Sequence, residues 1–289
     1  MKNNILLLWL FGMFFCSIYS CKKDSVNNPG YILRGKIKTL IQYDADTSGS
    51  TVSRYNYYYD TISGLLKKVE IQYRYLGEYY TTNIVVINHI DNNTIVYDNF
   101  EERRHKEKYR ILLDGKQITG IHSVDTLTGD ENIVTSVHFN NNTIDSIMDS
   151  GTFYAIAGDI NLYDLLYNNS NCTKFQSTWS DYMSGNINFN QEECVLTYNS
   201  LKNTNMVQFQ TRGEYNATVM GFIGYLLGID GYYLLKPNYN LIDSINRTYP
   251  SGYTIKYDYT FSQNNITRIQ ISYPPRSSEF NRYNDMTYY

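Results

Sequence analysis

The feature that most constrains this chain is a strand–turn–strand pattern that recurs along its length. In the first copy, Tyr55, Tyr57 and Tyr59 occupy alternate positions, turn-forming residues follow at 60–64, and residues 66–73 alternate again. Alternation with period two is typical of a β-strand, and Asp, Asn, Ser and Gly are the residues that tight turns prefer. Further copies cover residues 109–124, 136–148 and 255–273. We therefore expect consecutive antiparallel hairpins.

The composition favours strands over helices. The chain has 31 tyrosines, and Asn and Thr are also abundant. These residues suit a pleated, half-exposed surface better than a helix. We predict a mainly β fold, an extended or curled antiparallel sheet of consecutive hairpins, with rolling toward a barrel as the further option.

Two stretches depart from the strand pattern. Residues 156–166 place apolar side chains near helical spacing, with Asp159 as an N-cap. Residues 217–229 are almost entirely apolar but too short to span a membrane as a helix. We expect one or two short helices here, the second buried against the sheet, with a membrane-embedded hairpin as its alternative.

The N-terminus has the form of an export signal. Lys2 precedes an apolar run at residues 5–15, which ends at Ser20-Cys21. This end resembles the lipobox of bacterial lipoproteins, in which the cysteine is acylated and becomes the mature N-terminus. The resemblance implies attachment to a membrane through acyl chains on Cys21. An ordinary signal peptide cleaved near Ser20 is the alternative.

These features divide the chain into three parts. We expect a lipoprotein signal peptide at 1–20, a lipidated tether at 21–30 and an antiparallel β domain at 31–289, with a subdivision near residue 150 left open. The charged stretch that follows Cys21 resembles the surface-export signals of Bacteroidota lipoproteins. It is basic before it is acidic, so the choice between the cell surface and the periplasmic face stays open.

A second resemblance concerns the hairpins. Tyr59-Asp60 followed by Gly64-Leu65 is similar to the tyrosine-aspartate repeat of bacterial cell-surface proteins. With residues 257–269, the pattern resembles a group of Bacteroidota outer-membrane lipoproteins of unassigned function. The resemblance implies a β-rich envelope module and brings no catalytic residues.

Asp-Ser or Asp-Thr followed by an aliphatic residue recurs more often than composition predicts. Such triplets begin at Asp24, Asp60, Asp125, Asp145 and Asp243. They resemble the O-glycosylation sites of exported Bacteroidota proteins. Asp-Ser and Asp-Thr are also good turn residues, so a turn is the other interpretation.

Two cysteines follow Cys21 in the expected mature chain. In an oxidising compartment, a disulfide between Cys172 and Cys194 would close a loop of roughly 20 residues, worth about 3 kcal/mol. Two unpaired thiols are the alternative, because pairing does not follow from the sequence.

Catalytic motifs are absent from the sequence. It contains no nucleophile elbow, P-loop, dinucleotide fingerprint or zincin helix. A pair of carboxylates on a β scaffold leaves no signature, so a hydrolase acting on polysaccharide remains an alternative. His122 and His138 are predicted as cross-strand neighbours, but two ligands fall short of a zinc site, and we assign no metal or cofactor.

Charge and aromatic residues indicate the class of partner. The net charge is −3, and the run at residues 101–108 mixes signs, which argues against nucleic acid. Exposed rings at Tyr55, Tyr57, Tyr79 and Tyr80 would stack on sugars, whereas inward rings would only stabilise the sheet.

The leading hypothesis is a non-enzymatic, membrane-anchored envelope module that binds a glycan or another envelope protein. The alternatives are the polysaccharide hydrolase and an assembly factor of the outer membrane. A grooved sheet with an apolar interior would instead indicate lipid handling.

Overall fold

A computed structural model describes residues 35–44, 52–75, 77–101, 107–140, 143–149, 157–183, 186–203, 233, 238–247, 252–273 and 281–289. Within these ranges the chain forms sixteen strands and no helix. No helix in the described part of the chain is long and apolar enough to cross a membrane.

In chain order the strands are β1 (Ile37–Asp44), β2 (Val52–Tyr59), β3 (Leu66–Tyr75), β4 (Glu78–Asp91), β5 (Thr94–Glu101), β6 (Glu107–Asp114), β7 (Gln117–Val124), β8 (Glu131–Asn140), β9 (Thr143–Asp149), β10 (Ala157–Asn168), β11 (Asn171–Met183), β12 (Asn186–Lys202), β13 (Asn240–Arg247), β14 (Tyr253–Ser262), β15 (Asn265–Ser272) and β16 (Arg282–Tyr288).

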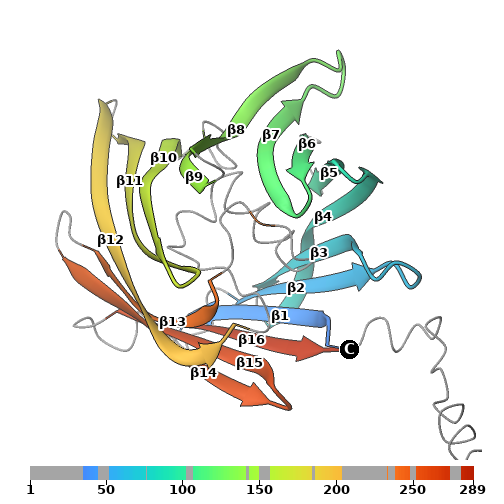
Figure 1. The fold of residues 1–289 in the computed structure, drawn as a ribbon. Coiled ribbons are helices and arrows are strands. Elements are labelled where there is room, and N and C mark those ends of the chain that lie inside the picture. The colour runs from blue at the N-terminus through green and yellow to red at the C-terminus, as the bar shows by residue number, and fades with distance from the viewer. Residues whose placement is uncertain are drawn as a thin grey trace, which may run out of the picture.

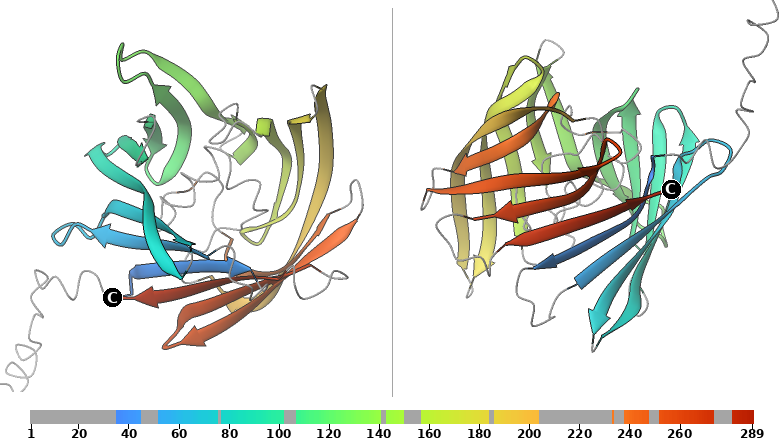
Figure 2. Two further views of the ribbon diagram at one scale, coloured as in Figure 1. Left: turned by 180° about the vertical axis from the view of Figure 1, so that it is seen from behind. Right: turned by 90° about the horizontal axis from the view of Figure 1, so that it is seen from below.

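The strands form a closed barrel (Figure 1). Each strand pairs antiparallel with the next in sequence, and β1 pairs with β16, where Leu40 lies opposite Met286. Figure 2 shows this closure from two directions, with β1 in blue beside β16 in red. The prediction of an extended or curled sheet was therefore wrong about the ends, because closure leaves no unpaired edge strand. The strands on either side of residue 150, β9 and β10, pair within the same barrel.

The four predicted hairpins are confirmed as β2–β3, β6–β7, β8–β9 and β14–β15. In the first, the turn is closed by a hydrogen bond from the Gly64 N–H to the Asp60 carbonyl (2.9 Å). Gly64 has a φ of +70°, a conformation that glycine adopts without steric cost. The turn predicted from Asp60 and Gly64 is therefore the turn that the structure contains.

The predicted helix at residues 156–166 was wrong, because this segment belongs to β10. The pairing of β10 with β11 shifts register between Tyr163 and Leu166, and Asp164 has a φ of +53°. A bulge inserts an extra residue and so breaks the alternation of the strand. The interrupted alternation produced an apolar spacing close to that of a helix. The second predicted helix, at 217–229, lies outside the described residues.

The two ends of the barrel are distinguished by which turns they carry. We call the end where the described chain begins the entry end and the opposite one the far end. The turns that follow the even-numbered strands lie at the entry end, and Tyr289 returns there, donating its N–H to the Lys36 carbonyl (3.1 Å). Tyr233, from the connection between β12 and β13, also reaches this end, where its N–H bonds the Lys116 carbonyl in the β6–β7 turn (3.0 Å).

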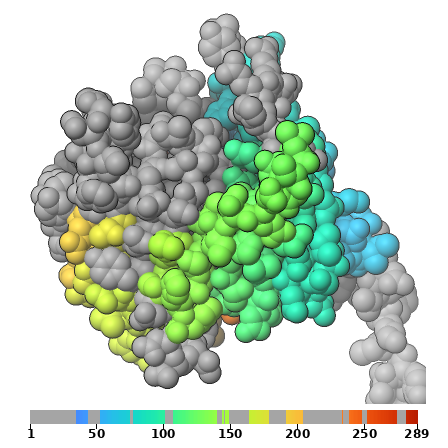
Figure 3. Space-filling view, turned by 90° about the horizontal axis from the view of Figure 1, so that it is seen from above, coloured from blue at the N-terminus to red at the C-terminus, as the bar shows by residue number. Residues whose placement is uncertain are grey.

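The core lies inside the barrel. Ile95, Ile111 and Ile121 are direct neighbours across β5, β6 and β7, and all three are fully inaccessible to solvent. Burying each such side chain contributes about 1.5–3 kcal/mol. On the outside, the side chains of β6 to β9 form a continuous surface, green in Figure 3.

Candidate functional site

The inner wall of the barrel is mainly apolar. It consists of the side chains that alternate inward from neighbouring strands. Those with at most 1% exposure include Leu40, Tyr57, Val69, Val85, Ile95, Tyr97, Ile111, Ile121, Ile147, Phe175, Ile245 and Ile255. The rings of Tyr97 and Tyr109 meet edge to face at 5.9 Å between centroids, a favourable aromatic geometry.

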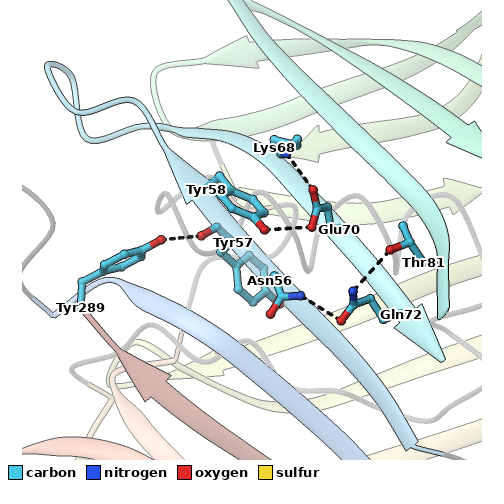
Figure 4. Close-up of polar contacts among 8 residues, drawn as sticks. All are labelled: Asn56, Tyr57, Tyr58, Lys68, Glu70, Gln72, Thr81 and Tyr289. Carbon is cyan, nitrogen blue, oxygen red and sulfur yellow. Dashed lines mark hydrogen bonds and ion pairs between the residues drawn. The ribbon is translucent and has the colours of Figure 1, made fainter. Parts of the chain in front are cut away.

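The outer wall carries hydrogen-bonded polar side chains. Across β2, β3 and β4, Asn56 donates to Gln72 (3.2 Å), which in turn donates to Thr81 (3.3 Å), as Figure 4 shows. Beside them, Glu70 accepts from both Tyr58 (2.8 Å) and Lys68 (2.8 Å). These networks run along a surface that faces away from the core.

Charged pairs continue the polar outer wall on the other side of β1. Arg268 binds Asp285 through two nitrogens, at 2.6 and 2.8 Å, and Tyr43 donates to the same carboxylate (3.0 Å). The Arg268 guanidinium holds the pKa of Asp285 below its usual value. Farther round, Glu131 contacts Arg110 (2.9 Å) and His122 (3.3 Å).

The wall polarity is the reverse of that in a barrel that spans a bilayer. Such barrels turn apolar side chains outward and polar ones inward, and an outward Arg or Lys at the bilayer midplane costs about 2–4 kcal/mol. Here Lys68, Arg110 and Arg268 point outward, while isoleucine and tyrosine point inward. The outer wall therefore suits water, and the interior suits an apolar environment.

Polar groups interrupt the mainly apolar inner wall. Asn83 on β4 donates to Asn99 on β5 (3.3 Å), both buried, and a charged cluster lies on other strands. On β12 and β13, Glu192 and Arg247 form an ion pair with 2% and 0% of their side chains exposed. Ser177 donates to Glu192 (3.0 Å), and Arg247 donates to the Tyr253 hydroxyl (2.6 Å). Register explains the grouping, because Ser177 lies opposite Glu192 and Arg247 lies opposite Tyr253. We call these four residues the inner polar cluster.

The inner polar cluster was missed at the sequence level. Its signal was weak, because Glu192-Glu193 in a strand gives no sign of which carboxylate turns inward. The structure separates them, since Glu193 pairs with Lys174 on the outer wall (2.5 Å). Burying the Glu192–Arg247 pair carries a desolvation penalty that a purely structural apolar pair would avoid. Polar groups placed in an apolar interior are the usual means by which a binding site orients a ligand.

The adjacent thiol is poorly suited to act as a nucleophile. Cys194 lies opposite Arg247 and is fully buried. Burial, followed by the charge of Glu192, raises the pKa of Cys194 to about 12. The thiol stays protonated near neutral pH, and the thiolate is the reactive form.

The predicted aromatic binding surface does not form. Tyr57 is 1% exposed inside the barrel, and Tyr55 packs against the same core. Tyr79 is half-buried with the Arg54 guanidinium 3.7 Å from its ring centre, and only Tyr80 is largely exposed. The pattern of alternation was right, but the face that carries Tyr55 and Tyr57 turns inward.

The two histidines are not cross-strand neighbours. His122 lies opposite Ile133, and Gly120 lies opposite Ser136, so His138 falls farther along β8. A register shift after Ile121 moves the pairing from the one we expected. Across the described ranges, no group of three or more His, Cys, Asp or Glu side chains is placed to hold a metal.

The two cysteines are separate thiols in the structure. Cys194 lies opposite Phe175, three positions from Cys172 along β11. Three strand residues span about 10 Å, and a disulfide needs Cα atoms within about 7 Å. This register does not bring the two sulfur atoms together. Cys21 lies outside the described residues.

Comparisons with known proteins agree on the fold alone. No protein-family model matches the sequence, and no curated protein matches it either. A porin-like protein from Bacteroides uniformis superposes with a TM-score of 0.59 at 12% identity, covering 89% of this chain and 98% of that one. A porin-like protein from Bacteroides vulgatus superposes with a TM-score of 0.52 at 12% identity, covering 88% of this chain and 98% of that one. The chain therefore has the fold of these porin-like barrels, with an apolar inner wall and a polar outer one.

Proposed function

We propose that this protein is a non-enzymatic envelope barrel that encloses a lipid or similar amphiphile, held at a membrane by acyl chains on Cys21. The observation that carries the proposal is the wall polarity. A mainly apolar inner wall shielded from water is the lining that an enclosed lipid chain would require, and a charged outer wall suits aqueous surroundings.

The inner polar cluster supports an amphiphile over a plain hydrocarbon. A guanidinium binds carboxylate or phosphate oxygens well. Arg247 is bonded to Glu192 and Tyr253, and Ser177 to Glu192, so a polar headgroup would have to join this network or replace Glu192 in it. These groups lie toward the far end, because β13 ends at Arg247 and β14 begins at Tyr253. A ligand with its polar group here would lay its chain along the apolar wall toward the entry end.

Two other functions fit less well. The structural neighbours are described as porin-like, but an aqueous pore needs a polar interior. Among the alternatives expected from sequence, a polysaccharide hydrolase needs converging carboxylates, and Glu192 is instead paired with Arg247. Glycan binding through Tyr55 and Tyr57 would need their rings outside the barrel.

A tryptophan reporter on each wall tests the proposal. In a Trp179→Phe background, Phe175→Trp places a fluorophore on the inner wall, and Phe100→Trp places one on the exposed outer side of β5. Both variants first have to retain the far-ultraviolet circular dichroism spectrum of the parent. We expect brominated fatty acids to quench the inner reporter saturably and to leave the outer reporter unchanged. Absence of inner quenching, together with ion conductance in planar bilayers, would instead support a pore.

A further inference from the structure

The entry end presents exposed apolar side chains at its turns. Ile62 in the β2–β3 turn is 86% exposed, and Ile90 beside the β4–β5 turn is 61% exposed. Leu166, Leu201 and Phe261 lie at the ends of β10, β12 and β14 and are also exposed. They come from turns that are far apart in sequence but share one end of the barrel. Their common position is therefore a property of the fold.

Lysines lie at the same end of the barrel. Lys38, Lys67, Lys116 and Lys202 are exposed at the entry end. The described turns of this end also carry three aspartates, Asp60, Asp91 and Asp114. Lys38 lies 5.4 Å from the ring centre of Tyr289. Such lysine and tyrosine side chains, with an apolar body and a polar tip, are suited to a membrane–water boundary.

The described part of the far end is the more acidic of the two. Its described connections and strand ends include Glu78, Glu107, Asp125, Asp130 and Glu131. Within the described residues, acidic side chains are thus concentrated toward the far end. An anionic surface would therefore repel the far end more strongly than the entry end, where the four lysines outnumber the three aspartates of the turns.

The chain also connects to the N-terminus at the entry end. The described part begins there at Gly35, and roughly 13 residues separate it from Cys21, an extended reach of about 45 Å. A tether of this length permits the barrel to stand away from the bilayer or to rest on it. The apolar turns and lysines favour direct contact.

We propose that the entry end docks on an anionic lipid surface, with Ile62 and Ile90 inserted among the headgroups and the lysines at the phosphate level. The partner is the bilayer itself, recognised by apolar insertion combined with positive charge. This docking is independent of any ligand in the interior, so its failure would leave the proposed lipid-binding function standing.

The structure offers a matched control for the test. Leu127 at the far end occupies the same position as Ile62 in a turn of the same sequence type and is 95% exposed. The test uses the chain without residues 1–21, which retains every described strand but has no lipid anchor. The unlipidated protein, Ile62→Asp and Leu127→Asp are each sedimented with vesicles of phosphatidylcholine alone or mixed with phosphatidylglycerol. The thermal unfolding midpoint of each variant verifies folding.

We expect salt-sensitive binding to the anionic vesicles, weakened at least about fivefold by Ile62→Asp and unchanged by Leu127→Asp. Replacing Lys67 and Lys116 by Gln should also weaken binding, whereas Lys108→Gln at the far end should not. Equal effects of the two aspartate substitutions, or no binding of the parent at low salt, would overturn the proposal. Equal binding to neutral and anionic vesicles would contradict the part of the proposal that assigns attraction to the lysines.

Discussion

Asp60 and Asp125 hold the same turn at opposite ends of the barrel. The Asp60 carboxylate accepts the N–H groups of Ile62 (2.9 Å) and Ser63 (2.7 Å). The Asp125 carboxylate accepts those of Leu127 (2.7 Å) and Thr128 (2.9 Å). In each turn a glycine four positions later closes the loop at 2.9 Å, with a φ of +70° at Gly64 and +79° at Gly129.

These turns give stability a pH dependence of known sign. The backbone N–H groups donate hydrogen bonds to the two carboxylates, and these bonds hold the pKa of Asp60 and of Asp125 below the usual value. A depressed folded-state pKa contributes stability that is present above the unfolded value, near 3.9, and is lost as the pH falls through the folded value. We expect Asp60→Asn to be less stable than the parent at pH 6, with the difference shrinking toward pH 3. Urea unfolding at both pH values measures it. A constant difference would contradict the assignment.

The Asp-Ser/Thr triplets divide into two structural classes. Those at Asp60 and Asp125 are the turns above, and their hydroxyl residues Thr61 and Thr126 are exposed. Those at Asp145 and Asp243 lie within β9 and β13, and the triplet at Asp24 is outside the described residues. The turn interpretation thus accounts for two of them.

If some of the triplets carry sugars, the solvent exposure of their Ser or Thr hydroxyl should decide which ones do. Ser244 is buried and shares a hydrogen bond with Thr197 (2.8 Å), so a glycan there would disrupt the barrel. We expect glycosylation in the native host, where it occurs within the described barrel, at Thr61 and Thr126. Intact-mass measurement of the parent and of the Thr61→Ala/Thr126→Ala variant tests this. A sugar on Ser244 would contradict the fold in this region.

The inner polar cluster predicts a non-additive mutant pair. Arg247→Met leaves the Glu192 carboxylate buried without its cation, which should destabilise the protein by about 3–5 kcal/mol. Adding Glu192→Leu removes that charge and should recover most of the loss. Urea unfolding of both single variants and the double variant measures the coupling. Additive losses would mean that the two side chains do not interact.

The cysteines should behave as two buried thiols. Burial raises the pKa of Cys172 and of Cys194 to about 12, so neither should react with a disulfide reagent at pH 8 in the folded protein. Unfolding without reductant should expose both, which a colorimetric thiol count detects. A count of zero would show that they pair, and the register of β11 with β12 would then need revision.

The sequence predicted the local structure well where turn chemistry and alternation agreed. The β2–β3 hairpin follows from Asp60, Gly64 and the strands beside them. Alternation alone left two candidate faces, and only closure of the barrel decides that Tyr57 points inward. Closure itself depends on β1 pairing with β16, a contact between the two ends of the described chain that no local pattern encodes.

The candidate site was harder to predict than the fold. Ser177, Glu192, Arg247 and Tyr253 are ordinary strand residues in the sequence, and their grouping depends on the register of four neighbouring strands. The bulge at Asp164 shows the converse effect, in which a single extra residue gave a true strand the apolar spacing of a helix.

The most direct test of the central claim is to analyse what the barrel holds. The tagged protein is purified from its native envelope in a mild detergent, washed extensively, extracted with organic solvent and examined by mass spectrometry. Because the outer wall is polar, we expect the purified protein to carry no ring of lipid around its outside. Because the interior is apolar, we expect about one tightly retained amphiphile per chain. A protein that carries no retained lipid and conducts ions across a planar bilayer would contradict the account.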